Sequence, residues 1–265
     1  MGKDLNFLLS DAINTLKYHK DNPVLKIYAE KIRTEYVSEI LNNKIYDIKP
    51  EEEMSKVKEN TIIKRDIEYG LMTEEWMNSP GLEELNSSIC NCMKCPLGKT
   101  RTNFVFGTGN PRAKIAVVGE APGAEEDIQG KPFVGRAGQL LTNILKSINF
   151  DREDVFICNI LKCRPPGNRN PMPDEIAGCE PYLFKQLELI KPRFILAAGT
   201  FAAQTLLKTK EPLGKLRGKF YDLLVADATI KVLVTYHPAA LLRNPNWKRP
   251  TWDDVKLLKK EYDKI

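Results

Sequence analysis

The chain of 265 residues is 42% hydrophobic and 28% charged, so it can bury a proper hydrophobic core. Its length suits one large domain, or a domain of about 180 residues with an accessory piece. No apolar run approaches the ~20 residues of a membrane-spanning helix, and the charged start does not resemble a secretory signal, so we expect a cytoplasmic protein. The net charge of +5 favours a polyanionic partner only weakly, because many proteins that bind no nucleic acid are equally basic.

The first 80 residues predict a helical extension of unknown role. Apolar residues recur at helical spacing over residues 5–19 and 23–42. Residues 48–66 are rich in charge and predict a linker or a solvated helix, and a further short helix is expected from residue 73. We place the domain boundary near residue 80, which divides the chain into 1–80 and 81–265. The helices of the extension offer a surface for a protein partner, and we expect a monomer.

Beyond residue 80 the chain alternates between strand-like and helical patterns. Apolar runs without polar alternation predict strands at 115–119, 155–161, 194–198 and 231–236. Helical patterns occupy 137–147, 174–190, 200–207 and 252–262. This order is typical of a parallel sheet that is covered on both faces. We therefore expect an α/β fold, a three-layer α/β/α arrangement around a central four-stranded parallel sheet.

The stretch from residue 119 to residue 141 follows the first predicted strand, where open α/β sheets bind ligands. Its glycines allow close approach of the backbone to a flat ligand, whereas the acidic run Glu125-Glu126-Asp127 disfavours phosphate. Phe133 is the aromatic residue of this loop, and it favours a pocket in which a neutral planar group stacks on the ring. The simpler interpretation is that Phe133 only packs in the core.

All six cysteines lie beyond residue 89, which indicates that they serve a site confined to this part of the chain. Disulfides explain them poorly in a cytoplasmic chain, so the choice is between metal ligation and chance burial. A C-x2-C pair, a cysteine just past the second strand and one on the next helix offer four thiolates, which suit zinc or an iron-sulfur cluster equally. These four are Cys92, Cys95, Cys163 and Cys179; Cys90 and Cys158 are expected bystanders, Cys158 as a small packing residue in a strand.

Several motifs, in this order, closely resemble the family 4 uracil-DNA glycosylases, iron-sulfur enzymes that remove uracil from DNA. They are Cys92-x2-Cys95, GEAPG at 119–123, GKPFVG at 130–135, NILKCRPPGNR at 159–169 and HPAALLR at 237–243. The resemblance runs from about Cys92 to the C-terminus and does not cover residues 1–80. It implies a DNA repair enzyme that hydrolyses the N-glycosidic bond of uracil and leaves an abasic site.

The resemblance also implies roles for individual residues. Phe133 should stack on the flipped base, and the side-chain amide of Asn159 should pair with the uracil edge. His237 should donate a hydrogen bond to uracil O2, and Glu126 should crowd the C5 position and exclude the thymine methyl. Cys92, Cys95, Cys163 and Cys179 should hold a 4Fe-4S cluster with a structural role.

The chemistry of base removal adds two requirements. An enzyme that extrudes a base needs a wedge, and Leu241, Leu242 and Arg243 combine an apolar tip with a cation. Related glycosylases place an aspartate in the first loop to handle the attacking water, but Ala121 stands at the matching position. Water positioning therefore falls to Asn159, Glu120 or the main chain, and leaving-group stabilisation should carry most of the rate.

Basic residues flank this proposed site and could track the phosphates of uracil-containing DNA. They are Lys208, Lys210, Lys215, Arg217 and Lys219 in one cluster, and Arg243, Lys248 and Arg249 after the wedge.

Each assignment has a simpler alternative. His237 could be a structural residue, Asn159 a strand-end cap, Glu126 a solvated acid and the two leucines ordinary core. For the whole chain, the alternatives are an iron-sulfur protein of the same fold that acts on another deaminated base, one that binds uracil-DNA without turnover, and an electron-transfer protein. A glycosylase-like protein that captures uracil covalently would carry a histidine-containing insert, and residues 164–174 contain no histidine.

Overall fold

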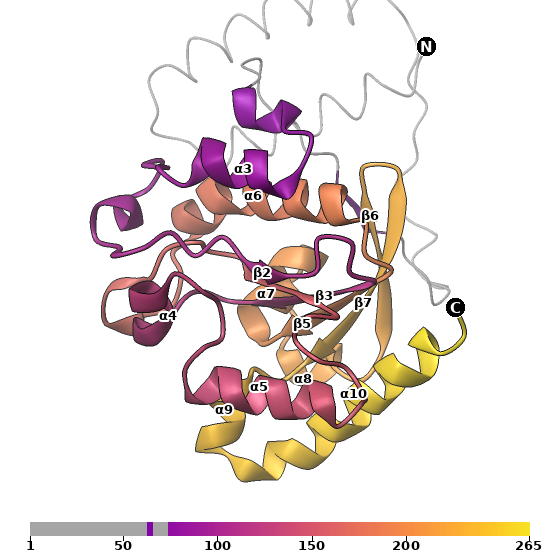
Figure 1. Cartoon of the computed structure of the whole chain (residues 1–265). Helices are drawn as coiled ribbons and strands as arrows, with labels where there is room; N and C mark the ends of the chain where they lie inside the picture. Colours follow the sequence, from indigo (N-terminus) through magenta and orange to yellow (C-terminus); the bar gives the residue numbers. More distant parts are fainter. Residues whose placement is uncertain (1–62, 66–73) are drawn as a thin grey trace, which may run out of the picture. The chain divides into compact units, whose positions relative to one another are not determined.

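The computed structural model describes residues 63–65 and 74–265 (Figure 1). The helices predicted at 5–19 and 23–42 lie outside the described residues, as does the predicted linker at 48–66 except for residues 63–65. Everything described belongs to one compact unit, Val57–Ile265. None of the helices in this part of the chain is long and apolar enough to cross a membrane.

The four predicted strands form the parallel centre of the sheet, as expected. They are β3 (Ile115–Gly119), β4 (Phe156–Asn159), β5 (Phe194–Ala198) and β7 (Ala228–Thr235), in the spatial order β4-β3-β5-β7. In this register Gly119 lies opposite Asn159, and Ala198 lies opposite Thr235. The carboxyl ends of these strands therefore meet along one edge.

The sheet of the described residues is wider than the predicted four strands and is mixed, in the order β1-β6-β7-β5-β3-β4-β2. The added strand β6 (Phe220–Val225) forms an antiparallel hairpin with β7, β1 (Ile63–Arg65) pairs parallel with β6, and β2 (Thr108–Gly109) pairs antiparallel with β4. Strand β2 is too short to show a pattern, and β6 is half-exposed, so neither carries the apolar run of a central strand.

The packed region begins before the boundary that we placed near residue 80. Strand β1 lies within the predicted extension but pairs with β6, and the buried Trp76 belongs to the hydrophobic core. Trp76 also meets Tyr182 edge to face, with ring centroids 4.8 Å apart. Because strand pairing and ring packing both depend on partners more than 100 residues away in the chain, composition could not locate this boundary.

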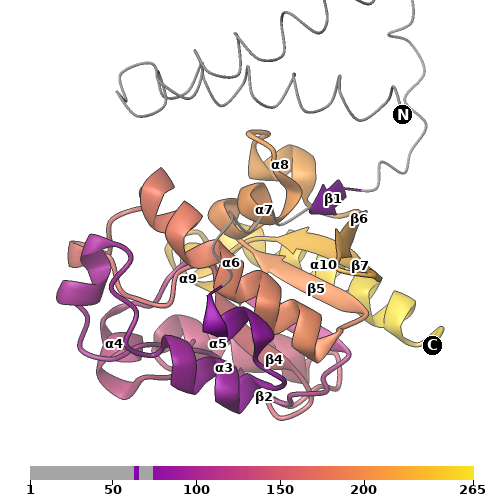
Figure 2. The same cartoon turned by 90° about the horizontal axis from the view of Figure 1, so that it is seen from above.

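Helices cover both faces of the sheet, which gives the expected three layers. Figure 1 shows α3 and α6 above the sheet and α5, α9 and α10 below it, and Figure 2 looks down onto α3 and α6. Alternate residues of β3 divide between the layers: Ala116 and Val118 join the core under α6 and α7, whereas Ile115 and Val117 join the core with α5 and α10. The helices are α3 (Leu82–Ile89), α4 (Ala124–Gln129), α5 (Arg136–Lys146), α6 (Pro173–Ile190), α7 (Thr200–Leu207), α8 (Leu213–Leu216), α9 (Pro238–Arg243) and α10 (Lys248–Tyr262).

Predicted and observed helices agree within one residue for α5, α6 and α7, and α10 begins four residues before its predicted start. Short 3-10 turns occur at Glu75–Asn78 (η1), Pro96–Lys99 (η2), Pro166–Asn168 (η3) and Pro245–Trp247 (η4). Helices α4 and α9 have six residues each, too few for a periodic pattern to identify, and both lie in segments that we treated as loops.

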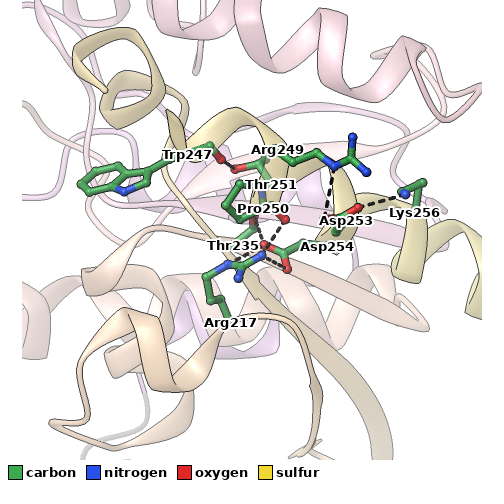
Figure 3. Close-up of polar contacts among 9 residues, drawn as sticks. All are labelled: Arg217, Thr235, Trp247, Arg249, Pro250, Thr251, Asp253, Asp254 and Lys256. Carbon is green, nitrogen blue, oxygen red and sulfur yellow. Dashed lines mark hydrogen bonds and ion pairs between the residues drawn. The ribbon is translucent and has the colours of Figure 1, made fainter. Parts of the chain in front are cut away.

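A buried ion pair fastens the carboxyl end of β7 to α10 (Figure 3). Asp254 of α10 is 1% exposed and accepts hydrogen bonds from Nε and Nη2 of Arg217, at 3.1 and 2.7 Å, and from the Thr235 hydroxyl at 2.7 Å. Arg217 also donates to the carbonyl of Pro250. Because Thr235 is the last residue of β7, this network sets the path of the chain that follows the strand.

We expect Asp254→Ala to lower the free energy of unfolding by about 3 kcal/mol, because it leaves Arg217 and Thr235 without their acceptor. Urea denaturation measures the loss. The neighbouring Asp253→Ala is a matched control, since Asp253 is 51% exposed and pairs only with surface cations, and it should leave the unfolding midpoint nearly unchanged. Equal losses in the two variants would contradict a structural role for the Arg217–Asp254 pair.

Candidate active-site pocket

A pocket of about 360 Å³ opens at the carboxyl ends of the parallel strands. Its walls come from the loops after β3, β4 and β7, where open α/β sheets bind their ligands. It brings together all six residues that we predicted for catalysis and substrate binding. These are Glu120, Ala121, Glu126, Phe133, Asn159 and His237, joined by Arg243 of α9 and by Pro165 and Asn168–Asn170 of the loop that contains η3.

Asn159 ends β4 and presents a buried amide to the pocket. Its side chain is 2% exposed, and Oδ1 has no hydrogen-bond partner among the described residues. A Cβ atom at Gly119 would lie 2.3 Å from this oxygen and 2.5 Å from the Phe133 ring, so only glycine fits there. Buried polar atoms without partners are rare in folded proteins, and this one is suited to accept a hydrogen bond from a ligand.

His237 begins α9, and the local backbone selects its tautomer. Nδ1 accepts a hydrogen bond from the Ala239 amide at 3.2 Å, so the neutral ring carries its proton on Nε2. Burial, and next the positive charge of Arg243, lower the pKa of His237 to about 4. The pocket therefore contains an uncharged hydrogen-bond donor.

Phe133 lines the pocket and also belongs to the core beneath it. Its backbone has a φ of 53°, a left-handed conformation that is rare for a bulky residue. Arg152 holds this conformation by donating to the carbonyls of Phe133 and Pro132, at 3.1 and 3.0 Å. The ring centroid is 5.4 Å from that of His237 at an angle of 30°, which leaves no room for a base between the two rings.

Glu126 braces the same loop from the other side. One carboxylate oxygen accepts from the amides of Val134 and Gly135, at 2.9 and 3.1 Å, and the other accepts from Gly123 at 3.1 Å. By contrast, the Glu120 carboxylate makes no hydrogen bond with any described residue, and burial raises its pKa. Of the two pocket carboxylates, Glu126 is committed to the loop and Glu120 is free.

The four cysteines proposed as ligands lie on segments that meet beside the pocket. Three of the four sulfurs lie near a hydrogen-bond donor: Tyr182 Oη lies 3.2 Å from Cys92 Sγ, Arg101 Nη1 lies 3.4 Å from Cys163 Sγ, and the Lys162 amide lies 3.3 Å from Cys179 Sγ. Burial raises the pKa of Cys163, whose thiol also interacts with Cys95 and Cys92. Donors of this kind stabilise thiolate ligands of a metal centre.

Among the described residues, no group of three or more Cys, His, Asp or Glu side chains is arranged to hold a metal ion. Cys158 is 1% exposed within β4, and Cys90 caps α3.

The predicted wedge and basic strip are only partly at the surface. Leu241 is 1% exposed because α9 packs against α5, whereas Leu242 is 39% exposed and Arg243 lines the pocket. Of the basic residues, Arg217 is bound to the buried Asp254 and so is not part of an open strip. Lys215 pairs with Glu211 at 3.2 Å on the surface.

The sequence analysis did not identify two residues that position groups of the site. Arg152 holds the Phe133 backbone, and Lys162, which is fully buried, donates to the carbonyl of Asn159 at 2.8 Å and to the side chain of Gln186. A lysine inside the apolar run after Asn159 was a usable signal, because a buried lysine needs partners. Arg152 carries no such signal, since it lies in a polar turn.

We expect the His237 imidazole to titrate near pH 4 in the folded protein, well below its ordinary value of about 6.5. Between these values the unfolded chain binds more protons, so folded-state stability should be lost as the pH falls across this interval. The chain has two histidines, and a His19→Gln variant leaves one imidazole to follow by NMR. A midpoint near 6.5 would contradict the buried, neutral ring.

Comparisons with known proteins agree with this geometry. The family model described as "Uracil DNA glycosylase superfamily" matches residues 106–256. A type-4 uracil-DNA glycosylase of Archaeoglobus fulgidus is 46% identical over 179 residues, which cover 66% of this chain and 90% of that protein. One from Pyrobaculum aerophilum is 48% identical over 168 residues (62% and 86%), and a type-5 uracil-DNA glycosylase of the same organism is 32% identical over 191 residues (60% and 83%).

Proposed function

Because this chain belongs to the uracil DNA glycosylase superfamily, we propose that it repairs DNA by hydrolysing the N-glycosidic bond of uracil and leaving an abasic site. The observation that carries the proposal is the buried Oδ1 of Asn159, to which none of residues 63–65 and 74–265 donates a hydrogen bond. Uracil offers it the N3–H donor, while the amide nitrogen of Asn159 can donate to uracil O4. Cytosine presents the opposite pattern at these two positions, so a site built on this amide rejects it.

Base flipping brings the uracil into the pocket, where Phe133 supplies a stacking surface. The ring is fixed before the base arrives, because Arg152 and Glu126 hold the loop on both sides of it. Glu126 occupies the wall at the C5 side of the base and excludes the thymine methyl. Since three backbone amides anchor its carboxylate, it resists displacement by that methyl group.

Cleavage places negative charge on the departing uracil and positive charge on the sugar. The Nε2–H of His237 donates to uracil O2 as this negative charge develops. A neutral donor suits the step, since it stabilises the leaving anion without transferring a proton to it. Preorganised donors of this kind contribute about 3–4 kcal/mol each to catalysis in other enzymes.

Water attack falls to Glu120 in this proposal. Ala121 has no group that could orient water, and the oxygens of Glu126 already accept backbone hydrogen bonds. The unpaired carboxylate of Glu120 lines the same pocket, where it can stabilise the positive sugar, hold a water and accept the proton that this water loses as its oxygen bonds to the sugar. Main-chain groups of the loop after β3 are the further groups that can position this water.

Cys92, Cys95, Cys163 and Cys179 would hold a 4Fe-4S cluster, which type-4 relatives and the surrounding donors support. When bound, the cluster braces the fold and takes no part in bond cleavage. The segment between Cys163 and Cys179 contains the pocket wall at Pro165 and Asn168–Asn170. Ligation at both ends of this segment would hold that wall in place.

The proposal predicts abasic product from a uracil-containing oligonucleotide and none from matched thymine or cytosine oligonucleotides, measured in a single turnover with protein purified without oxygen. Asn159→Ala should slow this reaction about 10²–10³-fold, since it removes the hydrogen bonds to the base. Asn143→Ala, an exposed asparagine on α5, should leave the rate unchanged. Absence of product from protein with an intact cluster would refute the glycosylase assignment and favour binding without turnover or action on another base.

Removal of the cluster should loosen the wall between Cys163 and Cys179. We expect Cys163→Ser, and wild-type protein stripped of iron, to be cleaved by trypsin after Arg169 faster than the loaded protein, because Arg169 precedes Asn170 within this wall. Cys90→Ser should keep the iron content and the protease resistance of the wild type, because Cys90 is not a ligand in this proposal. Wild-type iron content in Cys163→Ser would overturn the ligand assignment.

A further inference from the structure

The segment that follows the catalytic helix α9 is a nearly continuous exposed surface. Residues 242–249 are exposed except for the half-buried Asn244, and residues 236–252 contain no aspartate or glutamate. Three cations, Arg243, Lys248 and Arg249, lie in this segment, although Arg249 is 3.6 Å from Asp253 of α10. Residues 242–249, of which Arg243 lines the pocket, are therefore positively charged and contain one aromatic residue, Trp247.

Trp247 is 37% exposed, but its ring is held in place. It stacks on Tyr236 with centroids 4.7 Å apart and an angle of 5° between the planes. Tyr236 immediately precedes His237, and the Arg217 guanidinium lies 5.4 Å from the Tyr236 ring. Arg217 is in turn held by its ion pair with Asp254, which Figure 3 shows. This ion pair therefore also fixes the position of the stacked Trp247 and Tyr236 rings.

The backbone around Trp247 is also constrained. The Thr251 hydroxyl donates to the Trp247 carbonyl at 2.8 Å, and η4, which contains Trp247, packs against both α9 and α10. In Figure 3 the indole points away from the polar network around Asp254. A rigid ring costs little conformational entropy when a ligand covers it.

Proteins that bind single-stranded nucleic acid combine an exposed aromatic ring, on which a base stacks, with nearby cations that contact the phosphates. Trp247, with Arg243 before it in the chain and Lys248 and Arg249 after it, offers this combination. We propose that Trp247 stacks with a base of the uracil-containing strand that lies outside the pocket, close to the extruded uracil. This inference rests on the proposed function. The contact would hold the strand beside the site while the uracil is out of the base stack.

Trp252, which lies five residues after Trp247 in the chain, provides a matched control. It is 36% exposed, and Lys256 of its own helix lies 5.6 Å from its ring. We expect Trp247→Ala to bind a single-stranded oligonucleotide carrying an abasic analogue about tenfold more weakly than wild type, as for loss of one stacked base. Trp247→Phe should retain most of the affinity, and Trp252→Ala should remain within twofold of wild type. Equal affinities of Trp247→Ala and wild type would overturn the proposal.

A second experiment identifies the base. A series of oligonucleotides, each lacking one base next to the uracil position, should show one position at which wild type loses affinity. Trp247→Ala should be insensitive at that position and otherwise follow the wild-type profile. Identical profiles in the two proteins would mean that the indole touches no base and serves another partner, such as a protein.

Fluorescence gives an independent measurement. The three tryptophans are Trp76, Trp247 and Trp252, and Trp76 is 5% exposed, so in a Trp252→Phe variant a change of emission caused by contact with DNA reports on Trp247. Its emission should be quenched by the single-stranded oligonucleotide, and an unchanged emission at saturation would contradict stacking. Uracil excision by wild type, assayed in parallel, separates the two proposals: excision without any effect of Trp247 rejects only the stacking inference.

Discussion

The candidate site depends on the parallel pairing of β3 with β4, which sets Gly119 opposite Asn159. A side chain at position 119 would overlap both the Asn159 amide oxygen and the Phe133 ring, so a glycine at this position lets both groups lie against the end of β3. A register shift of one residue would turn Asn159 to the other face of the sheet. The specificity of the pocket is thus a property of strand pairing as much as of its side chains.

Around this pairing, charged side chains direct their hydrogen bonds to backbone groups of the pocket. Glu126 accepts from loop amides, Arg152 donates to the Phe133 carbonyl, and Lys162 donates to the Asn159 carbonyl. Each fixes a group that faces the ligand before the ligand binds. Such preorganisation is what allows a donor or a stacking ring to stabilise a transition state without rearrangement.

The pocket is also connected to two regions outside it. The loop with Pro165 and Asn168 runs between Cys163 and Cys179, so the proposed cluster and the substrate share one wall. On another side, the end of β7 is held by Asp254 and leads through Tyr236 to His237 and α9. Structural interactions therefore extend from the sheet to the surface that would meet DNA.

The sequence by itself determined the four central strands, the main helices and the six predicted pocket residues. Buried parallel strands are continuous apolar runs, and the pocket residues lie in short motifs next to strand ends, so local patterns suffice for both. Only the tertiary structure decided the wider sheet, because β1 and β6 are defined by pairing with each other and with β7. It also decided that Leu242, and not Leu241, is exposed, and that Arg152 and Lys162 support the site. These outcomes depend on which groups the folded chain brings together, and a local pattern contains no information on such distant partners.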